Sequence, residues 1–205
     1  MKNRHLILLL PIWLFSCTND FDGQIPNQEE QTNAVLKMKT NSINSNLSTI
    51  VRQLVTAYQL NNGSTPNTLS QKIILLEEIA NENADFVHIK PVNFSVPTVW
   101  EAHENLTNYN TVYTNLNVSV KVKNYFNLLL EQNINLNIVE SYIKDDVQLN
   151  ASEKELLVFI VNCIEDHSEN GDNDWKKKMI VAAATGYEVS TAATVFNVAL
   201  LRIYN

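Results

Sequence analysis

The chain has 205 residues, of which 45% are hydrophobic and 18% are charged, and its formal net charge is −7. This acidic balance argues against nucleic acid and anionic lipid headgroups as partners, because both repel a negatively charged surface. With only 4 glycines, the sequence also offers none of the glycine-rich loops that cradle phosphate groups.

The first residues have the pattern of a secretory signal peptide. Lys2 and Arg4 precede Leu6–Phe15, an apolar stretch of about ten residues, and the small Ser16 follows it. A membrane-spanning helix needs roughly 20 apolar residues, so this stretch is too short to stay in the bilayer. We expect residues 1–16 to be removed, and the loss of two basic residues then takes the net charge from −7 to about −9.

The tetrapeptide Leu14-Phe15-Ser16-Cys17 resembles the lipobox of bacterial lipoproteins. The resemblance implies that the Cys17 thiol is linked to diacylglycerol and that this residue begins the mature chain. Two or three acyl chains anchor a protein stably, whereas one chain holds it only reversibly. Thr18, rather than Asp, at the next position resembles the pattern of lipoproteins that are passed on to the outer membrane. Whether the protein faces the periplasm or the cell surface stays open. The alternative is an ordinary signal peptide in which the cysteine is incidental.

Two segments are expected after the signal peptide. Residues 17–31 are polar, contain a proline and a glycine and show no periodicity, which predicts a lipidated flexible tether. Residues 32–205 are within the size range of one domain, and we predict a single helical domain there.

From residue 32 onward, apolar residues recur three, four and seven positions apart, as in amphipathic helices. A first helix ends before residue 61, and a second begins at Asn67 or Thr68 and reaches about residue 80. The residues predicted to face the core in these two helices are Leu36, Ile43, Leu47, Ile50, Leu54 and Ala57, followed by Leu69, Ile73, Leu76, Ile79 and Ala80.

The next segments are less regular. Two prolines interrupt residues 84–97, which predicts a connector; 86–89 has the pattern of a short strand, but the sequence offers it no partner strand. Thr98 and Glu101 then have the spacing of a capping box, which predicts a helix from there to about residue 116.

Four more helices are predicted towards the C-terminus. Residues 118–129 begin with alternating valines but continue at helical spacing, so we predict a helix. Capping signatures that begin at Asn137 and Ser152 open helices reaching about residues 144 and 164, and the last helix covers 175–204. The fold class that follows is all-α, a helical bundle of about six to seven helices behind a signal peptide and a flexible tether.

Residues 179–201 of the last predicted helix contain one charged residue, Glu188, and are long enough to cross a bilayer. The small residues Ala182, Gly186, Ser190 and Thr194 lie four apart and would let another helix approach closely. Two interpretations follow. The favoured one is a central helix surrounded by its neighbours, and the alternative is a segment that inserts into membranes.

Residues 166–177 partly match a calcium-binding loop between two helices. The position that should supply a bidentate glutamate is Lys177, whose charge opposes a cation. We therefore favour a turn in which Asp172 or Asn173 caps the following helix. The weak calcium-loop candidates are Asp166, Ser168, Asn170, Asp172 and Asp174.

The sequence contains no catalytic constellation, and we predict no enzyme activity and no cofactor. Glu101, His103 and Glu104 resemble the start of a zinc-protease helix, but Thr107 stands where the second histidine ligand should be. Cys163 has no disulfide partner once Cys17 is lipidated, and we interpret it as a small buried hydrophobic residue.

Residues 149–186 resemble the C-terminal half of some uncharacterised secreted helical proteins of Gram-negative bacteria. In both, a helix capped by Ser-x-x-Glu precedes a tryptophan and a long helix of small residues. The resemblance covers a minor part of the chain, agrees with the helical fold and implies no activity.

The function predicted from the sequence is that of a lipid-anchored binding or interaction module in the cell envelope, located at the outer membrane. Its expected partners are the membrane, through the lipid anchor, and another envelope protein, with no nucleic acid. The alternative is a membrane-active or immunity-type lipoprotein that acts through its C-terminal helix of small residues. A hydrolase is the third and least favoured hypothesis.

Overall fold

The computed structural model describes residues 44–61, 66–132, 134–166 and 172–204. These residues belong to one compact unit, Lys39–Asn205. The predicted signal peptide, Cys17, the predicted tether and the start of the first predicted helix lie outside the described residues.

The described part of the chain is helical and contains no strand, which confirms the all-α prediction. It holds ten helices, more than the six or seven expected, because two predicted helices are each divided and one predicted connector is helical. In chain order the helices are α2 (Asn44–Leu60), α3 (Leu69–Glu82), α4 (Ala84–Ile89), α5 (Val99–Thr107), α6 (Tyr109–Asn115), α7 (Val120–Leu129), α8 (Leu136–Asp145), α9 (Ala151–Glu165), α10 (Asn173–Tyr187) and α11 (Thr191–Tyr204).

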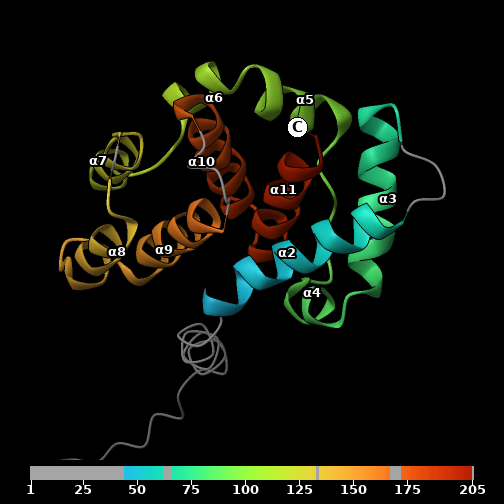
Figure 1. Cartoon of the computed structure of the whole chain (residues 1–205), viewed down its shortest axis with the longest axis horizontal. Coiled ribbons are helices and arrows are strands. Elements are labelled where there is room, and N and C mark those ends of the chain that lie inside the picture. Colours follow the sequence, from blue (N-terminus) through green and yellow to red (C-terminus); the bar gives the residue numbers. More distant parts are fainter. Residues whose placement is uncertain (1–43, 62–65, 133, 167–171, 205) are drawn as a thin grey trace, which may run out of the picture. The chain divides into compact units, whose positions relative to one another are not determined.

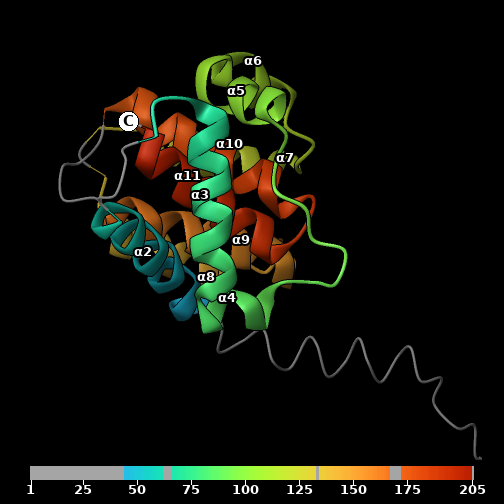
Figure 2. The same ribbon diagram turned by 90° about the vertical axis from the view of Figure 1, so that its right-hand side faces the viewer.

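Helices α10 and α11 lie at the centre of the bundle (Figure 1). Helices α2, α3 and α4 contact α11, while α5, α6 and α9 contact α10. Helices α7 and α8 contact α9. The view in Figure 2 shows α3 along one side of the central pair and α5 and α6 at one end of it. The favoured interpretation of the C-terminal segment, a centre surrounded by neighbours, is confirmed.

The prediction of one continuous helix over 175–204 is wrong, because the chain reverses between α10 and α11. The backbone N–H groups of Val189 and Ser190 both donate to the Gly186 carbonyl at 2.9 Å, and the Ser190 hydroxyl accepts from the Ala193 N–H at 3.1 Å. A Cβ atom on Gly186 would lie 2.5 Å from the Thr194 Cα. The small residues therefore allow the two halves of this segment to pack against each other.

None of the helices in the described residues is long and apolar enough to cross a membrane.

The connector over 84–97 is partly helical, so the prediction there is wrong for 84–89. The Asn83 side chain accepts from the Phe86 N–H at 2.8 Å and begins α4. Phe86 is fully buried, and its ring centre is 5.5 Å from that of Phe94 and 6.4 Å from that of Phe196 on α11. These three rings hold the segment before α5 against the central pair. Residues 86–89 belong to α4 and not to a strand.

The helix predicted from residue 98 to 116 is also divided, into α5 and α6, at Asn108. Its predicted start is confirmed, since Thr98 forms a complete capping box with Glu101. The caps predicted at Asn137 and Ser152 are wrong by two residues, because Asn135 caps α8 and Asn150 caps α9. The Asn135 side chain accepts from the Ile138 N–H at 3.3 Å, and the Asn150 side chain accepts from the Glu153 N–H at 2.9 Å, so these earlier asparagines begin the helices.

Most residues predicted to face the core are buried. In α2 the exception is Ala57, which is exposed, while Val51 is buried in addition to the predicted residues. The predicted residues that are buried are Leu47, Ile50, Leu54, Ile73, Leu76, Ile79 and Ala80, while Leu69 is half-buried.

Candidate functional site

A groove of 330 Å³ lies where α5 meets the turn between α10 and α11, and we call it the Trp100 groove. Its walls come from residues 95–97, from α5, from Val112 of α6 and from both helices of the central pair. Two apolar side chains at its margin, Trp100 and Val189, are each 70% exposed. Large exposed apolar side chains next to one hollow are typical of binding sites.

The position of Trp100 follows from the start of α5. The Thr98 hydroxyl accepts from the Glu101 N–H at 3.2 Å, and the Thr98 N–H donates to Glu101 Oε2 at 2.8 Å. This reciprocal pair fixes the first turn of the helix. Trp100 lies inside that turn, so its backbone is held in place while its side chain stays exposed.

The carboxylates of the groove are held by hydrogen bonds. The N–H and then the hydroxyl of Thr98 lower the pKa of the Glu101 carboxyl below its ordinary value, so this group is ionised at neutral pH. Glu104 Oε1 accepts from Asn108 Nδ2 at 2.8 Å. Both glutamates line the groove, and none of the described residues that line it is Lys, Arg or His. The groove is therefore acidic.

Neutral polar groups form the rest of the groove. Asn105 Nδ2 donates to Thr185 Oγ1 at 3.1 Å and so ties α5 to α10. The Thr185 hydroxyl in turn donates to the Val181 carbonyl at 2.8 Å. Asn197 of α11 adds a second amide to the lining. These side-chain amides can donate hydrogen bonds to a ligand and accept hydrogen bonds from it.

A second hollow, of 520 Å³, lies beside Arg202, and we call it the Arg202 hollow. Its lining combines two acids, Asp172 and Asp174, with two bases, Lys178 and Arg202. One guanidinium nitrogen of Arg202 donates to the Cys163 carbonyl at 2.6 Å. The charges of this hollow balance one another, in contrast to the acidic Trp100 groove.

The structure places the described calcium-loop candidates at helix ends. Asp172 accepts from the Trp175 N–H at 2.8 Å and caps α10, as the favoured turn interpretation predicts. Asp166 ends α9, and its carboxylate is 3.9 Å from the Arg52 guanidinium. Ser168 and Asn170 lie outside the described residues. Within the described part of the chain, no group of three or more His, Cys, Asp or Glu residues could hold a metal ion.

The other residues considered for chemistry have structural surroundings. Glu101 is the capping acid, and the His103 ring lies 3.2 Å from the Thr107 hydroxyl, which itself donates to the His103 carbonyl. Cys163 is completely buried, and burial raises the pKa of its thiol to about 12. Its interpretation as a buried hydrophobic residue is confirmed, since such a thiol is not ionised at neutral pH.

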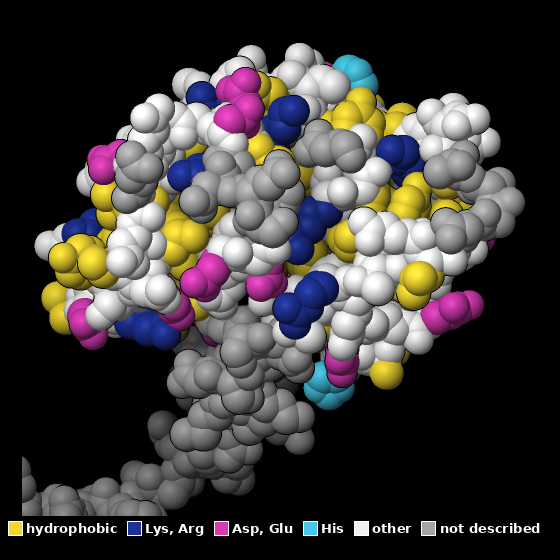
Figure 3. Space-filling view, viewed as in Figure 1, with side chains coloured by type: hydrophobic (Ala, Val, Ile, Leu, Met, Phe, Trp, Pro, Cys, Tyr) yellow, Lys and Arg dark blue, Asp and Glu magenta, His cyan; other side chains and the backbone are white. Residues whose placement is uncertain are grey.

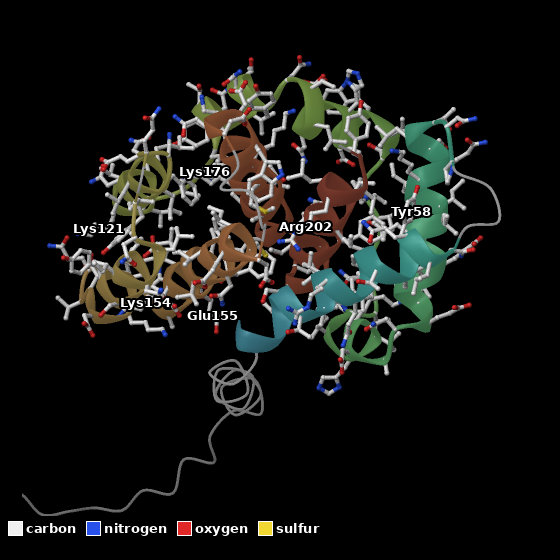
Figure 4. The ribbon with its side chains drawn as sticks, in the orientation of Figure 1. Tyr58, Lys121, Lys154, Glu155, Lys176 and Arg202 are labelled. Atoms are coloured by element: carbon white, nitrogen blue, oxygen red, sulfur yellow. The ribbon has the colours of Figure 1, made fainter. Side chains whose placement is uncertain are left out.

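Three buried polar groups join helices or lack partners (Figure 4). Lys176 of α10 is only 7% exposed, and its ammonium group donates to the Glu131 carbonyl, just after α7, at 3.4 Å. The Tyr58 hydroxyl and Arg202 Nε have no hydrogen-bond partner among the described residues.

Charges of both signs are mixed over the face shown in Figure 3, where basic, acidic and hydrophobic side chains alternate. No patch of one sign covers that face.

Sequence reasoning missed the Trp100 groove because the aromatic residues are scattered along the chain. The groove joins α5 to Val189 and Asn197, which are distant in sequence and become neighbours only after the chain reverses at Gly186. The single signal in the sequence was a tryptophan in the first turn of a capped helix, where no core position requires it.

No family model matches this sequence, and no curated protein and no solved structure is significantly similar to it.

Proposed function

We propose that this protein is a binding module of the cell envelope that is anchored at the outer membrane through a lipid on Cys17 and takes its ligand in the Trp100 groove. The observation that carries the proposal is the 70% exposure of Trp100 beside a groove of 330 Å³. The anchor rests on the lipobox resemblance of residues 14–17.

Exposed tryptophan is the main support for a binding role. Burial of a tryptophan side chain is favourable, so a partner that covers Trp100 would gain free energy that folding leaves unused. Tryptophan is also among the residues that most often dominate binding energy when a partner covers them. The polar groups of Asn105, Asn197 and Glu104 would fix the orientation of a ligand whose apolar part covers the indole.

The test places a photoreactive phenylalanine analogue at position 100 of the full-length chain and irradiates intact cells. The matched control carries the same analogue at position 142, because Tyr142 is 61% exposed on α8, outside the groove. We expect an adduct at position 100 that is absent at position 142. No adduct at either position, or the same adducts at both, would contradict the proposal.

The anchor is tested separately with Cys17→Ser. We expect the variant to lose the mass of the acyl chains and to leave the membrane fraction, because a single cysteine carries the whole attachment. Unchanged membrane association would refute lipidation at this residue and would leave the groove test unaffected.

The alternative function, a membrane-active or immunity-type lipoprotein, stays a prediction without a supporting observation. It would require the residues of α10 and α11 to leave the core, where most of them are buried. Exposing that much apolar surface costs much of the stability of a domain of this size.

A further inference from the structure

The charge and the aromatic side chain of the Trp100 groove together indicate the chemical class of its ligand. We infer that the groove binds an organic cation, with an ammonium or guanidinium group placed between the Trp100 ring and the carboxylates of Glu101 and Glu104. This inference rests on the proposed binding role of the groove and adds the chemical class of its ligand.

The lining of the groove selects against anions. Glu101 and Glu104 are the charged residues in it, and no described lining residue is basic. A phosphate or carboxylate ligand would meet two like charges without a compensating cation. A cation would meet two opposite charges, and the net charge of −7 attracts it from a distance.

The two carboxylates are prepared for such a ligand. The hydrogen bonds that Glu101 accepts from Thr98 all fall on Oε2, which leaves the acceptor capacity of Oε1 for a donor from outside. The bond from Asn108 falls on Oε1 of Glu104 and leaves Oε2 in the same way. Because these bonds fix the carboxylates in advance, a ligand loses less free energy in ordering them.

Four tyrosine rings of this chain already contact a cation. In the described residues, four lysine ammonium groups lie over tyrosine rings at 5.2 to 5.9 Å from the ring centres. No such internal cation lies over Trp100, although tryptophan has the ring that attracts cations most strongly. The Trp100 groove therefore has the aromatic ring and the carboxylates of a cation-binding site, and the described residues place no cation over that ring.

The size of the groove fits a small ligand or one side chain. Its volume, 330 Å³, is at the lower end of the range of small-molecule sites, roughly 300–1,000 Å³. Free amines and the Lys or Arg side chains of a peptide share the required chemistry. The experiment below includes both sources.

The test titrates the full-length chain with N-acetyl-arginine amide, N-acetyl-lysine amide and spermidine, and follows the indole N–H signals by NMR. The uncharged control ligand is N-acetyl-citrulline amide, which has nearly the shape of the arginine probe without its charge. We expect the Trp100 signal to shift with the cations, to shift little with citrulline, and to lose the shift as salt is raised. A stronger response to the amino-acid amides than to spermidine would indicate a peptide-borne cation.

The protein variants are Trp100→Ala and Glu104→Gln, with Tyr142→Ala as the control for an exposed aromatic residue outside the groove. Because Trp100→Ala removes the indole signal, the variants are compared by calorimetry, and we expect the dissociation constant for the arginine probe to rise roughly 2- to 30-fold in Trp100→Ala. Glu104→Gln keeps the acceptor for Asn108 and should also weaken binding, whereas Tyr142→Ala should not.

Three results would overturn the inference. If citrulline shifts the Trp100 signal as much as arginine does, and Glu104→Gln has no effect, the groove binds neutral ligands and its proposed binding role remains. If no cation binds while an adduct forms at position 100 in cells, the ligand belongs to another class. If no cation binds and no adduct forms, both the inference and the proposed function fail.

Discussion

The central pair α10–α11 and the start of α5 use apolar side chains in opposite ways. In α11, ten of fourteen residues are buried, including Phe196 with no exposed surface. At the start of α5, Val99 and Trp100 are 47% and 70% exposed. The first region stabilises the fold, whereas the second presents apolar surface that the fold does not need. Substitutions in the two regions should therefore separate stability from binding.

The largest expected effect is that of Phe196→Ala in the central pair. The Phe196 ring centre is 6.4 Å from that of the buried Phe86 and 6.2 Å from that of the half-buried Phe94, so its removal leaves a cavity beside these rings. We expect the free energy of unfolding to fall by about 3–5 kcal/mol, measured by urea denaturation. Phe196→Leu should cost less and keeps the measurement feasible if the alanine variant does not fold. A decrease of the free energy of unfolding by less than about 1 kcal/mol would show that this cluster contributes little to the stability of the core.

The next effect is that of Gly186→Ala at the reversal of the chain. The new Cβ would lie 2.5 Å from the Thr194 Cα, so the backbones of α10 and α11 must separate. We expect a loss of about 1–3 kcal/mol, even though alanine has the higher helix propensity. Thermal unfolding of Glu188→Ala, at the exposed end of α10, provides the control and should show almost no change. An equally stable or more stable Gly186→Ala would disprove the close contact.

A smaller effect is expected for Thr98→Ala, which removes the cap of α5. Loss of a capping side chain costs about 1 kcal/mol, measured by urea denaturation at neutral pH. The Glu101 pKa is lowered by Thr98, so the stability that comes from this pair is complete above the ordinary glutamate pKa. It is lost as the pH falls through the lowered pKa of the folded state. The difference between the wild type and Thr98→Ala should therefore shrink in acid, and a constant difference would assign the effect to the cap alone.

The smallest effect on stability is expected for Trp100→Ala. Because the side chain is 70% exposed, the free energy of unfolding should change by no more than about 0.5 kcal/mol. The same variant should weaken ligand binding, whereas Tyr142→Ala should alter neither property. A clear loss of stability in Trp100→Ala would mean that the indole supports α5 and would remove the contrast between the two regions.

Several features were predictable because they depend on short stretches of sequence. The Thr98 capping box, the Asp172 cap and the inward face of α3 follow from residue type and helical spacing. The misplaced caps at Asn137 and Ser152 show the limit of that reasoning, because two cap residues lie close together and either can begin the helix. In the structure Asn135 and Asn150 accept the cap hydrogen bonds.

The sequence by itself determined that the chain is helical and which side chains face inward, because a helix is built from contacts three and four residues apart. Only the tertiary structure decided where the long C-terminal segment turns back, because the approach of Gly186 to Thr194 depends on packing between helices. That reversal also brings Val189 and Asn197 to Trp100. The groove was invisible in the sequence for this reason: its walls come from segments that only packing brings together.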